Sequence, residues 1–250
     1  MSIARSRSPF IHLYSLCSQV LSSVPEDRYF GIMVTDDLSW SSHVQSIYSK
    51  PNSTLGFLHR NLWRCLAKLK ESAYISLVRS TLEYAASVWD PHLAKDINKL
   101  ENIHRRSARF VTGNYCTTSS VTQMLQQLGW QDFQSLRRDL RLPLLYKVVT
   151  GHVDIQPEHV GLVAADDRTG VEHQFKFRAV GSSTQAFCHS FAVRTVGNWN
   201  SLLSHVMKQS TPASFKVELS RLTSATYAPG NYLQHGCHLE IGQKWLRLTV

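Results

Sequence analysis

Apolar residues recur at three- and four-residue steps from about residue 40 to about residue 150, and this spacing constrains the fold of the 250-residue chain more than any other feature. It matches the turn of an α-helix, so each such segment is predicted to bury one side and expose the other. Residues 68–89 are predicted to form one long amphipathic helix, stopped by Asp90 and Pro91. Residues 94–111 are predicted to form the next helix, with His104 facing the core.

Prolines divide the rest of this helical region. Pro51 is expected to close a helix over 40–50 and to start another over 52–62. A last helix is predicted over 132–150, and a kink or break is expected where Pro143 falls inside it. Before these helices, residues 29–34 are rich in β-branched and aromatic side chains and are predicted to form a short buried strand.

The sequence changes character after residue 151. Residues 154–170 are loop-like, 173–180 alternate apolar and polar side chains as an exposed strand does, 187–193 fit a second strand, and 194–207 fit a short helix. The predicted fold is therefore mainly α, with a helical bundle, a short N-terminal strand or hairpin, and a small mixed α+β segment after the bundle. The predicted divisions are a leader (1–25), a helical domain (26–151), the mixed segment (152–220) and an irregular tail (221–250).

Basic residues outnumber acidic ones, since 27 Lys and Arg against 18 Asp and Glu give a net charge of +9. Such an excess favours polyanionic partners, such as nucleic acid or an acidic membrane face, without identifying one. No stretch approaches the roughly 18 to 20 apolar residues that span a bilayer, so no membrane insertion is predicted. The first 25 residues lack acids and carry Arg5 and Arg7, which fits an organelle import signal as well as an unrelated leader.

A line of basic residues in the helix predicted over 94–111 is the candidate functional site. Its members, separated by four, three, four and three residues, are Lys95, Lys99, Asn102, Arg106 and Arg109. This spacing places them on one face, roughly 200° from the apolar line, so the helix presents cations along about 20 Å while its other side is buried. Nucleic-acid backbones offer phosphates over that length. A solvated helix face without a ligand explains the same spacing equally well.

Other basic residues extend this candidate site. Arg105 adjoins the line, and Lys68 and Lys70 open the preceding helix. A further basic cluster on the last helix consists of Arg137, Arg138 and Arg141. Runs of charge are usually solvated surface, so these residues support the site without deciding it.

No motif of an enzyme, metal or cofactor site is convincing. Asp36 and Asp37 follow a hydrophobic strand, as the carboxylates of two-metal polymerases do, but that chemistry needs a further carboxylate from another strand. The five cysteines form no C-x-x-C pair, and the H-G-C-H run at 235–238 lacks the second pair that a zinc site needs. The sequence therefore predicts no catalytic residue, no bound metal and no cofactor.

Several longer motifs occur in the order found in one family. They are Y-F-G-I-M-V at 29–34, D-L-S-W-S-S-H-V at 37–44, L-G-F-L-H-R-N-L at 55–62, A-Y-I-S-L-V-R-S-T-L-E-Y-A-A-S-V-W-D-P at 73–91, L-E-N-I-H-R-R-S-A-R-F-V at 100–111, L-L-Y-K-V-V-T-G at 144–151, R-T-V-G-N-W-N-S-L at 194–202 and S-F-K at 214–216. With these motifs the chain resembles the downstream end of reverse transcriptases from LINE-type (non-LTR) retrotransposons of the jockey superfamily, over about three quarters of its length. It departs from the family at Arg79-Ser80, where members usually have R-P, and at Pro143.

The resemblance implies a role for each part. The segment from Tyr29 to Val34, which matches the family's Y-L-G-V, resembles the primer grip, a hairpin that steadies the primer end. The helices after it resemble the thumb, which closes on the template–primer duplex. Asp37 matches the aspartate of the family's D-L-x-W motif rather than a metal ligand. Because the family's catalytic F/Y-x-D-D motif belongs upstream of Tyr29, where this chain has none, we expect a non-catalytic fragment with a thumb-like bundle.

Two functions from different classes are therefore expected. The first is sequence-independent binding of RNA or an RNA–DNA duplex through backbone phosphates. The expected contacts are Lys95, Lys99, Arg105, Arg106, Arg109, Lys68 and Lys70, with Tyr29, Phe30 and Gly31 as secondary contacts. The second is a helical interaction module that packs on another polypeptide, such as a catalytic reverse transcriptase half supplied by a separate chain. A truncated or decayed element copy with no selected function is a third interpretation.

Overall fold

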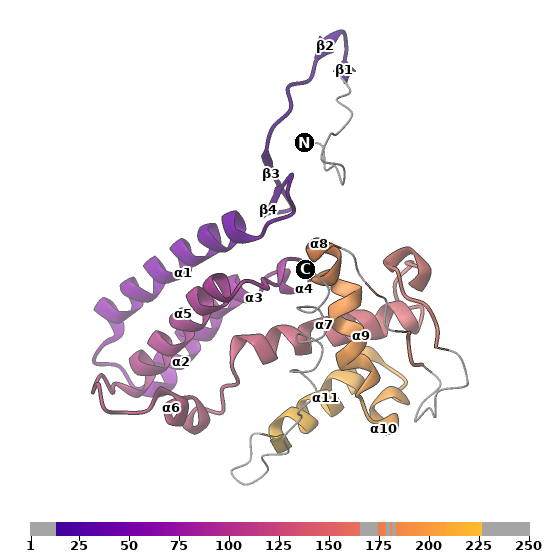
Figure 1. The fold of residues 1–250 in the computed structure, drawn as a ribbon. Coiled ribbons are helices and arrows are strands. Elements are labelled where there is room, and N and C mark those ends of the chain that lie inside the picture. Colours follow the sequence, from indigo (N-terminus) through magenta and orange to yellow (C-terminus); the bar gives the residue numbers. More distant parts are fainter. Residues whose placement is uncertain (1–13, 166–174, 179–180, 182–183, 227–250) are drawn as a thin grey trace, which may run out of the picture.

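The computed structural model of the chain describes residues 14–165, 175–178, 181 and 184–226. Two short antiparallel hairpins lead into a series of helices, so the fold is mainly α, as predicted (Figure 1). Most of the predicted leader, up to residue 13, and the predicted tail from residue 227 lie outside the described residues. Within the described residues, no helix combines the length and the apolar character needed to cross a membrane.

The hairpins are formed by four strands: β1 (Ser15–Leu16) with β2 (Gln19–Val20), and β3 (Glu26–Tyr29) with β4 (Ile32–Thr35). Phe30 and Gly31 connect β3 and β4 with φ angles of 46° and 81°, the pair of positive values that a two-residue type I′ turn requires. The prediction of one buried strand over 29–34 is therefore wrong, because the chain reverses inside it. Of those six residues only Ile32 is buried.

The helices before residue 130 are α1 (Ser41–Leu62), α2 (Ala67–Tyr74), the π-helical turn η1 (Ile75–Arg79), α3 (Ser80–Glu83), α4 (Ala86–Trp89), α5 (Ala94–Thr112) and α6 (Val121–Gln127). The later ones are α7 (Phe133–Val149), the 3-10 helix η2 (Pro157–Val160), α8 (Gln185–Cys188), α9 (Phe191–Asn200), α10 (Ser204–Met207) and α11 (Pro212–Thr226). Ser120 and Asp132 cap α6 and α7, because each side chain accepts a backbone N–H three residues on.

Two prolines lie inside helices that continue through them. Pro51 was expected to separate two helices, but α1 is a single helix of 22 residues. Pro143 likewise falls inside α7 without ending it. Both prolines are buried. The packing of their helices therefore outweighs the loss of one backbone hydrogen bond at each.

The prediction of one continuous helix over 68–89 is wrong, because the segment is divided into α2, η1, α3 and α4. The π-helical turn shifts the register, and Ala85, with a φ of 50°, interrupts the helix before α4. Trp89 is fully buried, and its indole N–H donates to the Tyr84 carbonyl at 2.7 Å, a bond across the break. Leu77 and Val88, which occupy inward-facing positions in the continuous helix predicted over 68–89, are consequently 53 % and 55 % exposed.

The second half differs from its prediction in four places. Residues 187–193, predicted as a strand, belong to the region of α8 and α9, and the helix predicted over 194–207 is divided between α9 and α10. Of the strand predicted over 173–180, the described part, 175–178, makes one isolated antiparallel bridge, between Ala164 and Phe177. The segment predicted as an irregular tail begins inside α11, which extends to Thr226.

Two hydrophobic cores meet in α7, a helix that runs from the first group of helices to α9 and α11 (Figure 1). Phe133 and Leu136, at its beginning, pack into the first core, which is built on α1 to α6. Leu142 and Tyr146, further along, pack into the second core, where the Tyr146 ring stacks on Phe215 with centroids 4.4 Å apart. One helix thus contributes to both cores.

His104 is a packed core residue, as predicted. It is buried against Tyr74 and Trp130, with its Nδ1 2.7 Å from the Tyr74 hydroxyl and its Nε2 3.0 Å from the Gln131 carbonyl oxygen. Because a carbonyl only accepts, Nε2 carries the proton and Nδ1 accepts from Tyr74. Burial lowers the pKa of His104 to about 4, so the ring is neutral near pH 7.

Acidification is expected to destabilise the fold. The pKa of His104 is lower in the folded state than its ordinary 6.5, so the unfolded chain takes up a proton first. The stability is present above pH 6.5 and is lost as the pH falls from there toward 4. His104 alone should remove about 2 kcal/mol of the free energy of unfolding between pH 7 and pH 5. His43, whose pKa burial also lowers to about 4, acts in the same direction.

Urea unfolding at the two pH values measures this loss. The variant His104→Gln, which does not titrate, should show a flatter pH dependence than the parent chain. Equal free energies of unfolding at pH 7 and pH 5 in the parent chain would contradict the assignment.

Candidate nucleic-acid interface

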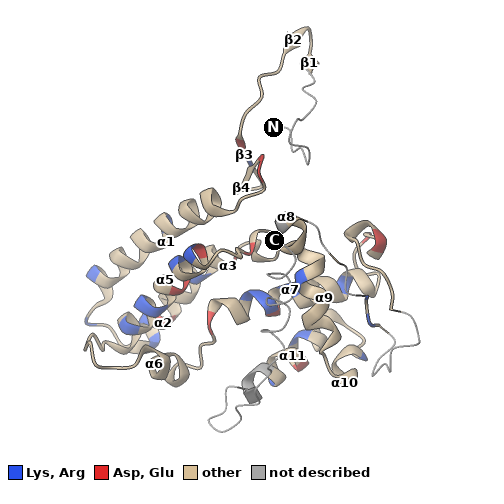
Figure 2. Cartoon of the chain, in the orientation of Figure 1, with Lys and Arg blue, Asp and Glu red and all other residues tan. Residues whose placement is uncertain are grey.

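Lys and Arg residues occur on α5 (Figure 2), and the burial pattern places the predicted line of cations on the side of this helix away from the core. In the line, Lys95, Asn102 and Arg106 are exposed and Lys99 and Arg109 are half-buried, and the adjoining Arg105 is exposed. None of these side chains is buried. We call Lys95, Lys99, Arg105, Arg106 and Arg109 the α5 ridge.

Helix α1 lies beside the ridge and runs in the same direction as α5. The Ser41 hydroxyl donates to Asp96 at 2.6 Å, near the beginning of both helices. Further along, Lys99 Nζ donates to the Gln45 side-chain carbonyl at 2.8 Å, and Arg106 donates to that of Asn52. Neutral amides therefore hold two ridge cations in place without cancelling their charge.

Two ridge cations have additional partners. Lys99 Nζ lies 3.9 Å from the buried carboxylate of Asp96. Arg109 reaches past the end of α5 and donates to the Cys116 carbonyl at 2.9 Å. Lys95, Arg105 and Arg106 have no carboxylate within ion-pair distance in the described part of the chain. These three residues therefore offer the ridge's least compensated charge.

Lys68 and Lys70 are both predicted from the sequence to contact nucleic acid, but they occupy different environments. Lys68 is exposed in the first turn of α2. Lys70 is 8 % exposed, and its Nζ lies 5.6 Å from the centre of the Phe110 ring. Lys70 is therefore not part of the exposed basic surface to which the sequence assigned it.

The tip of the β3–β4 hairpin exposes two aromatic rings. Tyr29 and Phe30 are 69 % and 75 % exposed and contact each other edge to face, with ring centroids 4.6 Å apart. The Tyr84 hydroxyl donates to the Phe30 carbonyl at 3.0 Å, which fixes the tip against the helices. Gly31, also exposed, completes the turn at positive φ.

The basic cluster predicted on the last helix is largely buried around an aspartate. Arg137 donates to Asp90 Oδ1 at 2.7 Å, Arg141 donates to Oδ2, and Arg194 Nη2 lies 3.0 Å from Oδ2. Arg137 and Arg141 are 1 % and 5 % exposed, so they are not available to a ligand at the surface. Burial lowers the pKa of Arg141 to about 10, which leaves it protonated near neutral pH. We call Asp90 and its three arginines the Asp90 cluster.

No local pattern in the sequence predicts this cluster. From the sequence, Asp90 is predicted to stop a helix, and Arg137, Arg138 and Arg141 are predicted to form a basic cluster on the last helix. The partners lie 47 and 51 residues apart in sequence for Arg137 and Arg141, so neighbouring residues do not indicate the pairing. Arg138 remains partly exposed and pairs with its neighbour Asp139 at 2.9 Å.

Asp37, the second aspartate after β4, stabilises the turn before α1. Asp37 Oδ1 accepts hydrogen bonds from the Thr35 hydroxyl at 2.6 Å and from the Ser39 N–H at 2.9 Å. The hydrogen bond from Thr35, with a smaller effect from Ser39, lowers the pKa of this carboxyl. Among the described residues, no group of three or more His, Cys, Asp or Glu side chains is arranged to hold a metal ion.

No protein-family model, curated protein or solved structure matches the chain. The interpretation of this surface therefore depends on the residues described above and on the sequence motifs.

Asp90→Asn is expected to destabilise the fold strongly, because it leaves three arginines near a neutral side chain. Removing one partner of a buried ion pair typically costs about 3–5 kcal/mol. Glu218→Gln is the matched control, since its partner Arg221 is largely exposed and such surface pairs contribute about 1 kcal/mol or less. Chemical unfolding of both variants measures the difference. A loss below about 1 kcal/mol for Asp90→Asn would contradict the role given to the cluster.

Proposed function

We propose that this chain binds template–primer nucleic acid, either RNA or an RNA–DNA duplex, through backbone phosphates. In this proposal it is a non-catalytic, thumb-like part of a reverse transcriptase of the LINE type. The observation that carries the proposal is the α5 ridge, a line of accessible cations on a helix whose opposite side is packed in the core.

The dimensions and charges of the ridge suit a polyanion. Lys95 and Arg109 are separated by 14 residues, or about 21 Å at the rise of an α-helix. A duplex offers several phosphates over that length, and contacts to phosphates carry no sequence information. The amides of Gln45 and Asn52 beside the ridge hold two of its cations and add hydrogen-bonding groups of their own.

The hairpin tip extends the proposed interface beyond the ridge. The Ser42 hydroxyl of α1 donates to Glu26 of β3 at 2.7 Å, so the hairpin lies against the beginning of α1, and the ridge starts beside the same end. The exposed rings of Tyr29 and Phe30 suit contact with a base or sugar at a strand end. This arrangement agrees with the primer-grip role that the motif resemblance implies.

The proposal is for binding without polymerisation. The Asp37 carboxylate is engaged in its turn and matches the family's D-L-x-W motif. Incorporation of nucleotides by the purified chain on a primed RNA template would contradict this part of the proposal.

An apolar stripe favours a second candidate, the helical interaction module. Leu66, Leu69 and Leu77 follow one another at helical spacing with Ala73 between the last two, and the three leucines are 81 %, 52 % and 53 % exposed. A partner polypeptide, such as a catalytic reverse transcriptase half, would cover such side chains.

A salt titration separates the two candidates. Phosphate binding by the four line cations Lys95, Lys99, Arg106 and Arg109 predicts that log K falls with log salt concentration with a slope of about −3 to −4. Because Lys99 and Arg109 have other partners, we expect the slope to lie nearer −3 than −4. Fluorescence anisotropy of a labelled RNA–DNA hybrid between about 50 and 200 mM salt measures the slope.

Two substitutions test the ridge itself. The double variant Lys95→Gln/Arg106→Gln should weaken binding and reduce the magnitude of the slope by about 2. Lys208→Gln, an exposed lysine after α10, is the matched control and should change neither. Absent binding, or binding with a flat salt dependence, would reject the ridge proposal in favour of the interaction module.

A further inference from the structure

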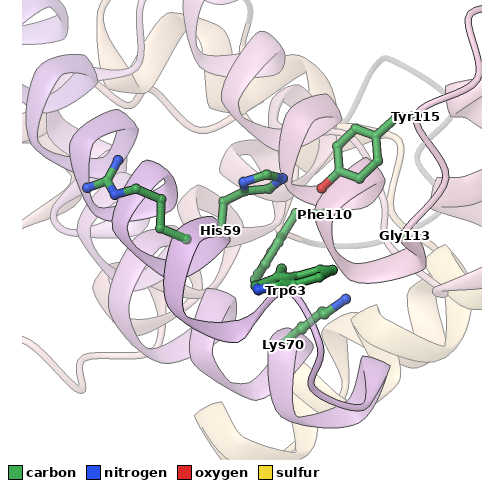
Figure 3. Close-up of a pocket in the computed structure, with 7 residues that line it drawn as sticks. His59, Trp63, Lys70, Phe110, Gly113 and Tyr115 are labelled. Carbon is green, nitrogen blue, oxygen red and sulfur yellow. The ribbon is translucent and has the colours of Figure 1, made fainter.

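A cavity of about 600 Å³ opens where α1 and α5 end. Its rings are His59, Trp63, Phe110 and Tyr115, which Figure 3 shows gathered around one space. Arg60, Lys70 and Gly113 complete the lining. The volume lies within the range of small-molecule sites in proteins.

Lys70 lies in this cavity without a charged partner. It is 8 % exposed, and the described residues provide its ammonium with neither an ion pair nor a hydrogen bond. Its ammonium lies over the face of the Phe110 ring. The side chain is largely buried, but the ammonium itself is not shut off from the cavity, so an anion entering the cavity would pair with it.

The other walls suit a flat, apolar group. Trp63 and Tyr115 are both more than half exposed, so their ring surfaces are available to a ligand. Arg64 lies over the Trp63 ring at 4.4 Å, which adds a third cation beside Arg60 and Lys70. No carboxylate lines the cavity among the described residues. The three nearby cations also disfavour a cationic ligand, which an aromatic cage alone would suit.

The cavity lies at the far end of the α5 ridge. Phe110 follows Arg106 by four residues, which is about 6 Å along the helix axis. Because α1 and α5 run in the same direction, the β3–β4 hairpin lies beside the beginning of α1, where the ridge starts, and the cavity lies where both helices end. A strand held by its phosphates along the ridge would therefore bring its next nucleotide to the cavity.

We propose that this cavity binds a single unpaired nucleotide, with the base against Trp63 and Tyr115 and the phosphate on Lys70. The inference rests on the proposed nucleic-acid function and assigns to it a site for a base outside the duplex. Stacking on aromatic side chains accepts any base, so the site is not selective for sequence.

Two measurements test the site. Calorimetric titration with adenosine monophosphate probes the cavity without the ridge, and anisotropy compares a blunt RNA–DNA hybrid with one that carries a single-stranded extension. We expect saturable nucleotide binding, weaker binding of adenosine without phosphate, and tighter binding of the extended hybrid by about fivefold or more.

Substitutions in the cavity show whether nucleotide binding occurs there. Trp63 is exposed, and methionine has a volume similar to that of Lys70, so these changes should leave the fold intact. Trp63→Ala and Lys70→Met should abolish nucleotide binding and the gain from the extension, and Trp63→Phe should keep part of both. Phe57→Ala is the control, because Phe57 is an exposed ring of α1 outside the cavity lining.

The outcomes separate this inference from the proposed function. Equal affinities for blunt and extended hybrids together with no nucleotide binding would overturn the cavity assignment and leave the ridge proposal standing. If the extended hybrid still binds more tightly than the blunt hybrid in the Trp63→Ala variant, the assignment is also overturned. Nucleotide binding that depends on Trp63, with no binding of either hybrid, would support the cavity and reject the ridge.

Discussion

The rest of the structure depends on one buried carboxylate, that of Asp90, which binds three arginines. Asp90 lies after α4, while the arginines that bind it come from α7 and α9, so the cluster joins the first core to the second. Desolvating these charges is expensive, and the hydrogen bonds of the carboxylate offset that cost only while every partner stays in position. Arg194 also donates to the Asp90 backbone carbonyl at 2.8 Å, which fixes the loop itself.

The surface proposed to bind nucleic acid is a consequence of packing on the opposite side of α5. Burial of Leu100, His104 and Ala108 orients the helix, and this orientation leaves the basic residues outward. Contacts with α1 then decide which of these basic side chains are held by hydrogen bonds. Lys99 and Arg106 are held by amides, whereas Lys95 and Arg105 extend into solvent. The chemistry of the ridge therefore depends on the core beneath it.

The sequence predicts the features that local spacing determines, such as α5, its inward His104 and its outward cations. It fails where a distant residue decides the outcome. The break before α4 accompanies the burial of Trp89, which no periodicity encodes. Arg137 and Arg141 look like surface residues because Asp90, their partner, is far away in sequence. Lys68 and Lys70 are two positions apart, yet only tertiary packing places the second beside Phe110.

The shared direction of α1 and α5 has an electrical consequence. Neighbouring helices that run antiparallel largely cancel their dipoles, whereas a parallel pair places two partial positive charges at one end and two partial negative charges at the other. Arg64 and Lys70 gather where the carbonyl ends lie, as this field favours. The pair of helices therefore carries a dipole along its length. A linear polyanion that binds along the pair has two orientations of different energy.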